Sequence, residues 1–367
     1  MGLTPPKHIR NLESYTVTSQ DVWKHKDNNS SLKLDWNEST VVNKIVQKRL
    51  IEFFRSYGSI NWYPDVEARS LTKKISKFLD CSPMQVLVFG GSDVALDSIA
   101  RTFLTIGDNV SLVHPSYDNF RVYAESCGAQ VLKINGIVKD GLFDIGQFID
   151  ELTNISRLRM IYLINPNNPI GYLIPKDSIT KILNTFPNTA VVIDEAYIEF
   201  AGMSNSSANL VNEYDNLLVC RSFSKAFGIA GLRLGYVVSN QKNLNYLKKV
   251  RNGKNVSMSA QIAGETLLDN LDEVKKHIIK INDSKEWFSN QLNSLGINYL
   301  DGHANFVLVK VKKPQEVLIN LKRNGIFIRD RSYIEGLDNY LRITIGYREQ
   351  MQKVLKVLKE SPELWKL

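Results

Sequence analysis

The sequence predicts an α/β protein with a large, mostly parallel sheet of seven strands and a smaller α+β domain. Between about residues 46 and 282, short apolar runs alternate with stretches of helical periodicity, the pattern of strands joined by covering helices. After residue 283 the pattern changes to a long amphipathic helix, three strands and a terminal Lys-rich helix. At 367 residues the chain is long enough for two domains. We expect an N-terminal arm that is also part of the small domain over 1–45, a large domain over 46–282 and a small domain over 283–367.

Seven β-rich apolar runs are predicted as the strands of the large sheet. They are Gln85–Phe89, Val110–Val113, Gln130–Ile134, Met160–Ile164, Ala190–Ile193, Leu217–Arg221 and Leu234–Val238. Between the first two, Leu96, Ile99 and Phe103 repeat at helical spacing and Gly107 provides a stop, so this segment is a strand, a glycine turn and a helix. The strands of the smaller domain are predicted near Phe306–Val311, Ile326–Arg329 and Leu341–Ile345.

The composition excludes several classes of protein. Hydrophobic residues make up 43% and charged residues 23% of the chain, which rules out a disordered or collagen-like protein. No apolar run is long enough for a membrane span or a signal peptide, so we expect neither. Cys81, Cys127 and Cys220 form no close pair and the histidines are scattered, which favours a reduced, cytoplasmic protein without a metal site.

The net charge of +8 has two readings that do not involve nucleic acid. The lysines are dispersed over helical stretches and are not interleaved with aromatic residues, as they would be on a nucleic-acid surface. A solvated basic face or anionic small-molecule substrates explain the charge better.

A motif centred on Lys225 carries the first chemical signal. A lysine at a strand end is, by itself, a common solvated residue. Here Ser222 and Ser224 flank it, and Arg233 follows eight residues later. A partly desolvated amine can form a Schiff base with an aldehyde, while hydroxyls and a guanidinium can hold a phosphate. This combination indicates the anchor of pyridoxal 5′-phosphate, PLP.

Four further strand ends offer the other groups that PLP needs. Asp194 follows a buried run and can keep the pyridine nitrogen protonated, although an aspartate at a helix N-terminus is the simpler reading of that residue alone. The turn Asn165–Gly171, held by prolines, can direct an amide at the phenolate oxygen. The turn Gly90–Asp93 lies between a strand and a helix, where backbone N–H groups favour an anion. Tyr117 can supply an aromatic face.

The same glycine turn argues against other nucleotide or hydrolase chemistry. It has neither the three spaced glycines of a dinucleotide site nor the Gly-Lys-Ser/Thr of a Walker loop. It also lacks the second glycine of a hydrolase nucleophile elbow. These readings therefore lose support.

With these residues in place, the sequence resembles the fold-type I PLP-dependent aminotransferases, and most closely the histidinol-phosphate aminotransferase family. The resemblance covers nearly the whole chain and implies the fold-type I PLP-transferase fold, PLP as cofactor and transamination. Besides the motifs above, the matching segments are Ile9–Tyr15, Lys33–Glu38, Tyr63–Asp65, Gly325–Asp330 and Asn339–Gly346.

The resemblance also implies a role for each matched residue. Lys225 holds the cofactor covalently, Asp194 pairs with the pyridine nitrogen, and Asn168 and Tyr197 bond the phenolate oxygen, while Tyr117 stacks on the ring. The cofactor phosphate is held by Ser92, Asp93 through its backbone, Ser222, Ser224, Arg233 and, from the neighbouring subunit, Tyr63. The substrate anion is bound by Arg342, with Tyr15, Asn168 and Arg329 assisting. A homodimer with shared active sites is therefore implied.

Two segments depart from the family pattern and concern the substrate. The family's usual Asn-Glu-Asn-Pro is Asn37–Thr40 here, without the proline, and a segment that commonly begins Pro-Tyr reads Gly253–Ser257. We hypothesise that the surface for an imidazole has changed and that Lys254 adds a cation for a smaller, more anionic substrate. The alternative is that Lys254 simply faces solvent.

The resemblance leads us to expect an aminotransferase with ping-pong kinetics and glutamate as the amino donor. The acceptor is expected to be a small phosphorylated carbonyl compound, either imidazole acetol phosphate or dihydroxyacetone phosphate, the latter giving serinol phosphate. One alternative is a PLP-dependent decarboxylase of a phosphorylated amino acid such as phosphoserine or phosphothreonine. Another is a catalytically silent binding protein on the same fold, against which the intact Lys225, Asp194 and Arg233 argue. We expect no nucleic-acid or membrane partner.

Overall fold

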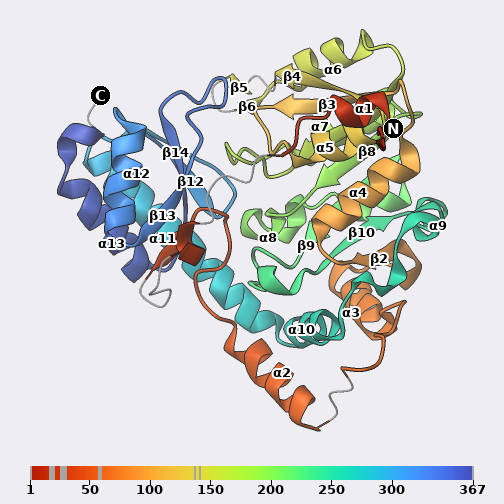
Figure 1. Cartoon of the computed structure of the whole chain (residues 1–367), viewed down its shortest axis with the longest axis horizontal. Helices are drawn as coiled ribbons and strands as arrows, with labels where there is room; N and C mark the ends of the chain where they lie inside the picture. Colours follow the sequence, from red (N-terminus) through yellow and green to blue (C-terminus); the bar gives the residue numbers. More distant parts are fainter. Residues whose placement is uncertain are drawn as a thin grey trace.

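The computed structural model describes residues 2–15, 21–24, 31–56, 60–135, 138–139 and 142–365. Two sheets, each with helices packed on it, form two lobes (Figure 1). The long helix α11 (Leu271–Ser294) runs from the larger lobe into the smaller one. The predicted domain boundary after residue 282 falls inside this helix, and the boundaries stay predictions.

The larger sheet has seven strands in the order β2-β10-β9-β8-β7-β3-β4. All seven predicted strands are present, with ends that differ by no more than two residues from the prediction. They are β2 (Val86–Phe89), β3 (Asn109–His114), β4 (Gln130–Asn135), β7 (Leu158–Ile164), β8 (Ala190–Asp194), β9 (Leu217–Ser222) and β10 (Gly235–Ser239). Strand β10 is antiparallel to both of its neighbours, while the pairs from β9 to β4 are parallel. The mostly parallel α/β fold is confirmed.

Helices bury both faces of this sheet. Val86 and Val88 belong to one apolar core, whereas Leu87 and Phe89 point into the other. The first core includes α3 (Arg69–Leu79), α6 (Ile145–Thr153), α7 (Lys176–Thr185) and α10 (Met258–Asp269). The second includes α4 (Ser92–Phe103), α5 (Asn119–Ser126) and α9 (Gln241–Val250). Because both faces are covered, a ligand can reach this sheet at its strand ends.

The smaller lobe contains a five-stranded sheet in the order β1-β13-β14-β12-β11. Its strands are β1 (Leu32–Leu34), β11 (Tyr299–Asp301), β12 (Phe306–Lys310), β13 (Ile326–Asp330) and β14 (Tyr340–Thr344), covered by α11, α12 (Pro314–Arg323) and α13 (Arg348–Lys359). The three predicted strands are β12, β13 and β14. Strand β1 pairs in parallel with β13, so the N-terminal segment joins this lobe and carries residues 35–38 into the space between the lobes.

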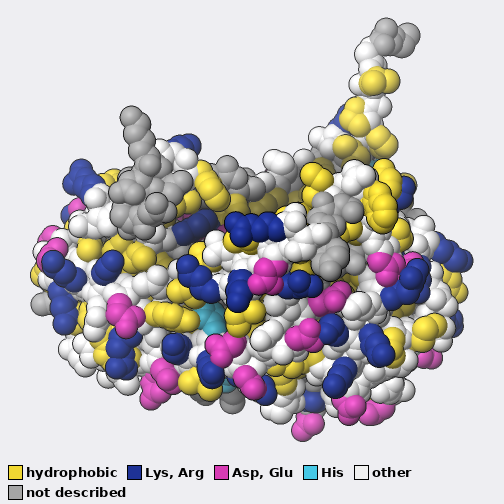
Figure 2. Space-filling model, turned by 90° about the horizontal axis from the view of Figure 1, so that it is seen from below, with side chains coloured by type: hydrophobic (Ala, Val, Ile, Leu, Met, Phe, Trp, Pro, Cys, Tyr) yellow, Lys and Arg dark blue, Asp and Glu magenta, His cyan; other side chains and the backbone are white. Residues whose placement is uncertain are grey.

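The remaining elements are short or lie at the periphery. Besides short 3₁₀ helices, they are α1 (Lys7–Arg10), α2 (Lys44–Ser56), α8 (Ile198–Ala201) and the strands β5 (Val138–Lys139) and β6 (Leu142–Phe143). Helix α2 extends away from the body of the molecule (Figure 1). Within the described ranges, no helix is both long and apolar enough to cross a membrane. Figure 2 shows one face of the molecule, where basic and acidic side chains are intermixed.

Candidate active site

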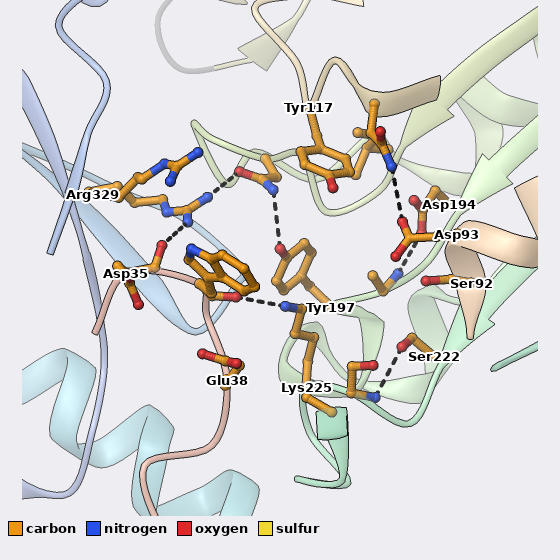
Figure 3. A pocket seen from close by; sticks show the side chains of 18 of the residues that line it. Asp35, Glu38, Ser92, Asp93, Tyr117, Asp194, Tyr197, Ser222, Lys225 and Arg329 are labelled. Carbon is orange, nitrogen blue, oxygen red and sulfur yellow. Dashed lines mark hydrogen bonds between the residues drawn. The ribbon is translucent and has the colours of Figure 1, made fainter. Parts of the chain in front are cut away.

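A cavity of about 620 Å³ lies between the carboxyl ends of the large sheet and the strands β13 and β14 (Figure 3). Most of the predicted site residues meet in it although they come from distant parts of the chain. Those that line it are Tyr15, Ser92, Asp93, Tyr117, Asn168, Asp194, Tyr197, Ser222, Ser224, Lys225, Arg233, Arg329 and Arg342. Tyr63 and Lys254 do not line the cavity of their own chain.

Lys225 enters the cavity from the loop that follows β9. Its Nζ donates a hydrogen bond to the main-chain oxygen of Trp36 at 2.7 Å. Burial lowers the pKa of Lys225 to about 8, although the nearby carboxylate of Glu38 acts in the opposite direction. A lower pKa leaves more of the amine neutral at physiological pH, and the neutral amine is the form that attacks an aldehyde.

Asp194 is the last residue of β8 and is 5% exposed. Its Oδ2 accepts a hydrogen bond from the Tyr162 hydroxyl at 2.9 Å, and its Oδ1 accepts one from the Ala196 N–H at 3.1 Å. Burial raises the pKa of Asp194 to about 6, with the Tyr162 hydrogen bond opposing it. Both of these hydrogen-bond donors, the Tyr162 hydroxyl and the Ala196 N–H, are neutral groups. A buried carboxylate of this kind fits a cationic partner such as a protonated pyridine nitrogen.

The first turn of α4 and Arg233 form a cradle for a phosphate. Gly91 has φ +102° and directs the chain from β2 into α4, whose first backbone N–H groups have no partner inside the helix. Arg233 donates from Nη2 to Asp93 Oδ2 at 3.0 Å and from Nη1 to Ser224 Oγ at 3.5 Å. Ser222 Oγ in turn accepts from the Ser224 N–H at 3.0 Å. Hydroxyls, helix N–H groups and one guanidinium are the donors that a phosphate monoester requires.

Gly235 controls the position of this cradle. A Cβ at residue 235 would lie 2.5 Å from the Ser92 nitrogen and 2.7 Å from the Gly91 carbonyl carbon. Both are backbone atoms, so Gly235→Ala must displace the turn. We expect at least about a tenfold loss of PLP affinity and about 1–3 kcal/mol of lost stability. Fluorescence titration of the apoprotein with PLP and urea unfolding measure both effects.

The matched control for Gly235→Ala is Gly146→Ala in α6. There the nearest atom to an added Cβ is Asp144 Oδ1 at 3.4 Å, and the backbone is helical. We expect this variant to bind PLP as the wild type does. Equal PLP affinity for both variants would contradict the placement of the cradle.

Tyr197 is the centre of a hydrogen-bond network in the middle of the cavity. Its hydroxyl accepts from Asn168 Nδ2 at 3.2 Å and from Asn37 Nδ2 at 3.0 Å. Asn168 Oδ1 accepts from Arg342 Nη1 at 2.6 Å. Tyr117 forms the wall above, with the ring of Tyr15 edge-on at 5.7 Å between centroids. This arrangement holds an amide and a phenol where a ring-bound oxygen can meet both.

Arg329 and Arg342 occupy the small-lobe end of the cavity. They lie directly opposite each other on β13 and β14 and are 4% and 3% exposed. Arg342 Nη2 donates to the main-chain oxygen of Asp35 at 2.7 Å. In Figure 3, Arg329 lies across the cavity from Ser92 and Asp93, with Tyr197 and Lys225 between them. The cavity therefore has guanidinium groups at both ends, with Arg233 paired to Asp93 on the large lobe and Arg329 and Arg342 on the small lobe.

Several residues that line the cavity or bond to its lining were given no role from the sequence. Trp36 and Asn37 belong to a segment that matched the family, but their contacts to Lys225 and Tyr197 depend on the pairing of β1 with β13. Tyr162 could have been noticed as a hydroxyl inside an otherwise apolar strand. Arg331 also lines the cavity, one residue beyond the end of β13.

Tyr63 and Lys254 lie together outside the cavity. The Lys254 ammonium is 4.3 Å from the centroid of the Tyr63 ring, which is 75% exposed. The roles suggested for both residues stay predictions.

No group of three or more His, Cys, Asp or Glu side chains placed for a metal ion occurs in the described ranges.

Residues 29–358 match the family described as aminotransferase class I and II. The chain belongs to this family. It is 33% identical over 360 residues to a dihydroxyacetone phosphate transaminase from Campylobacter jejuni, covering 96% of each chain. It is 34% identical over 330 residues to a histidinol-phosphate aminotransferase from a Thermoanaerobacter species, covering 89% of this chain and 92% of the relative.

Solved structures show the same architecture. The histidinol-phosphate aminotransferase from Sinorhizobium meliloti, in complex with PLP, superimposes with a TM-score of 0.86 at 23% identity over 96% of each chain. The L-threonine-O-3-phosphate decarboxylase from Porphyromonas gingivalis gives a TM-score of 0.77 at 25% identity, covering 91% of this chain and 99% of that one. The protein is therefore a PLP-dependent transaminase with the fold-type I architecture, and the expected fold, cofactor and reaction type are confirmed.

Proposed function

We propose that the enzyme transfers an amino group from glutamate to a small phosphorylated ketone, with dihydroxyacetone phosphate as the first candidate and serinol phosphate as its product. The observation that carries this proposal is the pair of buried arginines, Arg329 and Arg342, at the end of the cavity opposite the phosphate cradle. A second anion site in addition to the cradle suits a substrate that has its own phosphate. One relative, 33% identical to this chain over 96% of its length, is named for dihydroxyacetone phosphate. Imidazole acetol phosphate, the acceptor suggested by the histidinol-phosphate aminotransferases, is the second candidate.

Each lining residue has a task in this proposal. PLP supplies an electron sink that stabilises negative charge at the substrate Cα. Asp194 keeps the pyridine nitrogen protonated, and Asn168 and Tyr197 donate to the phenolate oxygen. Lys225 would hold PLP covalently between turnovers, and its Nζ as a free amine would act as the base that takes the proton from the substrate Cα and as the acid that returns it. Arg342 orients the substrate through its anion, which fixes which Cα bond stands perpendicular to the ring.

The proposed substrate is tested with purified holoenzyme in two half-reactions. Glutamate should convert the PLP absorbance band to that of pyridoxamine phosphate, and dihydroxyacetone phosphate should restore it with formation of serinol phosphate. Imidazole acetol phosphate is compared at the same concentration. Recovery of the band with imidazole acetol phosphate alone would contradict the first candidate.

Decarboxylation is a second candidate function, favoured by the likeness to the threonine-phosphate decarboxylase. The same anion site and the same lysine serve both reactions, because the bond that breaks depends on a small difference in substrate placement. Release of carbon dioxide from phosphoserine or phosphothreonine, without a keto acceptor, distinguishes this reaction from transamination.

A homodimer with Tyr63 contributed to the neighbouring cofactor phosphate is also part of the proposal. Exposed apolar side chains gather on α2 and the segment after it, and a second subunit packed there would remove them from water. They are Ile51, Phe54, Ile60, Trp62 and Tyr63, each at least 46% exposed. Lys254 lies on Tyr63 and would accompany it to the partner's site.

Complementation between inactive chains tests the shared site. Mixed dimers of Lys225→Ala and Tyr63→Ala chains form one site with a wild-type lysine and a wild-type tyrosine. We expect activity to recover toward a quarter of the wild-type value, since half of the sites in half of the dimers are intact. No recovery of activity in mixtures that contain verified mixed dimers would contradict the shared site.

Lys254→Ala should raise the KM for the phosphorylated substrate with unchanged PLP affinity.

A further inference from the structure

The face of the small sheet that meets the cavity carries three arginines. Arg329 and Arg342 are cross-strand partners on β13 and β14. Arg331 follows Arg329 by two residues, which places the two side chains on the same face. All three line the cavity, and Arg331 is 6% exposed. Like charges held together in a buried region destabilise a protein unless a counter-ion joins them.

The hydrogen-bond partners of Arg331 and Arg342 leave much of the charge of these two side chains uncompensated. Arg331 Nη1 donates to the Tyr333 hydroxyl at 3.1 Å, while its Nε is buried without a hydrogen-bond partner. The two hydrogen bonds of Arg342 go to an amide oxygen of Asn168 and a main-chain oxygen of Asp35. Across the residues described by the structure, neither Arg331 nor Arg342 forms an ion pair with a carboxylate. Burial, followed by the charge of Arg331, lowers the pKa of Arg342.

The number of guanidinium groups fits one class of anion better than another. A carboxylate has two oxygens and one negative charge, so two arginines satisfy it. A phosphate monoester has three terminal oxygens and a charge near −2 at pH 7. A third arginine therefore finds a further charged oxygen to bind when the ligand is a phosphate, but no further oxygen when the ligand is a carboxylate. This difference matters because a transaminase receives its amino donor and its acceptor in the same cavity.

We propose that Arg331 is a specificity-determining residue that binds the third oxygen and the second negative charge of a phosphate dianion, favouring the phosphorylated substrate over a carboxylate. Tyr333 orients the Arg331 side chain for this contact. The inference rests on the proposed function, because it names the group that distinguishes the two substrates of that reaction.

The test compares the two half-reactions of the holoenzyme in Arg331→Gln. We expect kcat/KM for dihydroxyacetone phosphate to fall at least about tenfold more than kcat/KM for glutamate, since one charge-assisted contact is lost from the phosphate alone. Arg331→Lys should recover part of the loss, because it restores the charge without the planar fork. The control Arg323→Gln removes an exposed arginine of α12 and should leave both half-reactions unchanged.

A binding measurement separates this inference from the proposed reaction. Calorimetric titration of the holoenzyme uses glycerol 3-phosphate and glycerate, which present a phosphate and a carboxylate on a similar carbon chain. The wild type should bind glycerol 3-phosphate more tightly at pH 7.5 than at pH 5.5, because the second phosphate pKa lies near 6. Arg331→Gln should lose at least about tenfold in affinity for glycerol 3-phosphate, and much less for glycerate.

The outcomes distinguish the two proposals. Equal losses for both probes, or no loss for either, would contradict the role of Arg331. If the wild type turned over no phosphorylated ketone but Arg331→Gln still lost glycerol 3-phosphate selectively, the proposed substrate would be wrong and the phosphate role of Arg331 would stand.

Discussion

Lys225→Ala is expected to reduce turnover by at least about 10⁴-fold, the largest effect of any single substitution in this protein. In the proposed mechanism, the variant lacks both the covalent link to PLP and the amine that moves the proton at the substrate Cα. It should still bind PLP, because the cradle of Arg233, Ser224 and the α4 N-terminus is unchanged. The absorbance band of lysine-bound PLP should therefore be replaced by that of the free aldehyde.

A small primary amine sharpens the test of Lys225. Methylamine can enter the space left by the side chain and accept the proton, so it should restore part of the lost rate in Lys225→Ala. Lys242→Ala, at an exposed position of α9, is the matched control and should behave as the wild type. Turnover in Lys225→Ala within tenfold of the wild type would contradict the role of this lysine.

Asp194→Asn is expected to reduce turnover by at least about 10³-fold, because a neutral amide no longer keeps the pyridine nitrogen protonated and the ring becomes a weak electron sink. The amide has nearly the same shape as the carboxylate, and the Tyr162 hydroxyl can still donate to its oxygen. PLP should thus remain attached to Lys225 while the half-reaction with glutamate becomes slow. Stopped-flow absorbance of that half-reaction measures the effect, and a rate near that of the wild type would contradict it.

Asp194 is also expected to affect how the stability of the apoprotein depends on pH. Its folded pKa of about 6 lies above the value of 3.8 expected in the unfolded chain, so the folded state binds more protons between these values. Stability should therefore fall as pH rises, by about 2 kcal/mol between pH 4.5 and 7.5 relative to Asp194→Asn. Urea unfolding of both apoproteins measures this difference, and added PLP should reduce it because its cationic ring nitrogen stabilises the carboxylate. Parallel pH curves for the two apoproteins would contradict the buried, uncompensated carboxylate.

The large sheet was predictable because its strands are buried on both faces. The run Val86–Phe89, for example, is apolar throughout and ends at the glycine turn Gly90–Asp93, which locates the strand and its end. Strands β1 and β11 were missed because each has three residues and includes a charged one, Lys33 or Asp301. Their identity as strands depends on pairing with β13 and β12, which local sequence does not encode.

The candidate site was predictable where chemistry follows a strand end. Lys225, Asp194 and Asn168 were found in this way, and the structure places all three in one cavity. Asn37 reaches Tyr197 from the opposite lobe, a contact that depends on how the two sheets meet. Arg331 has no motif of its own and becomes notable only beside Arg342. The shared site proposed for Tyr63 and Lys254 is still harder to predict, because the sequence of one chain does not encode which surfaces of two chains meet.

The most direct test of transamination at this cavity is the absorbance of the holoenzyme during sequential addition of glutamate and dihydroxyacetone phosphate. We expect glutamate to convert the lysine-bound PLP band to the pyridoxamine phosphate band, and dihydroxyacetone phosphate to restore it with one serinol phosphate formed per site. A band that glutamate leaves unchanged, in an enzyme that releases carbon dioxide from phosphothreonine, would contradict transamination.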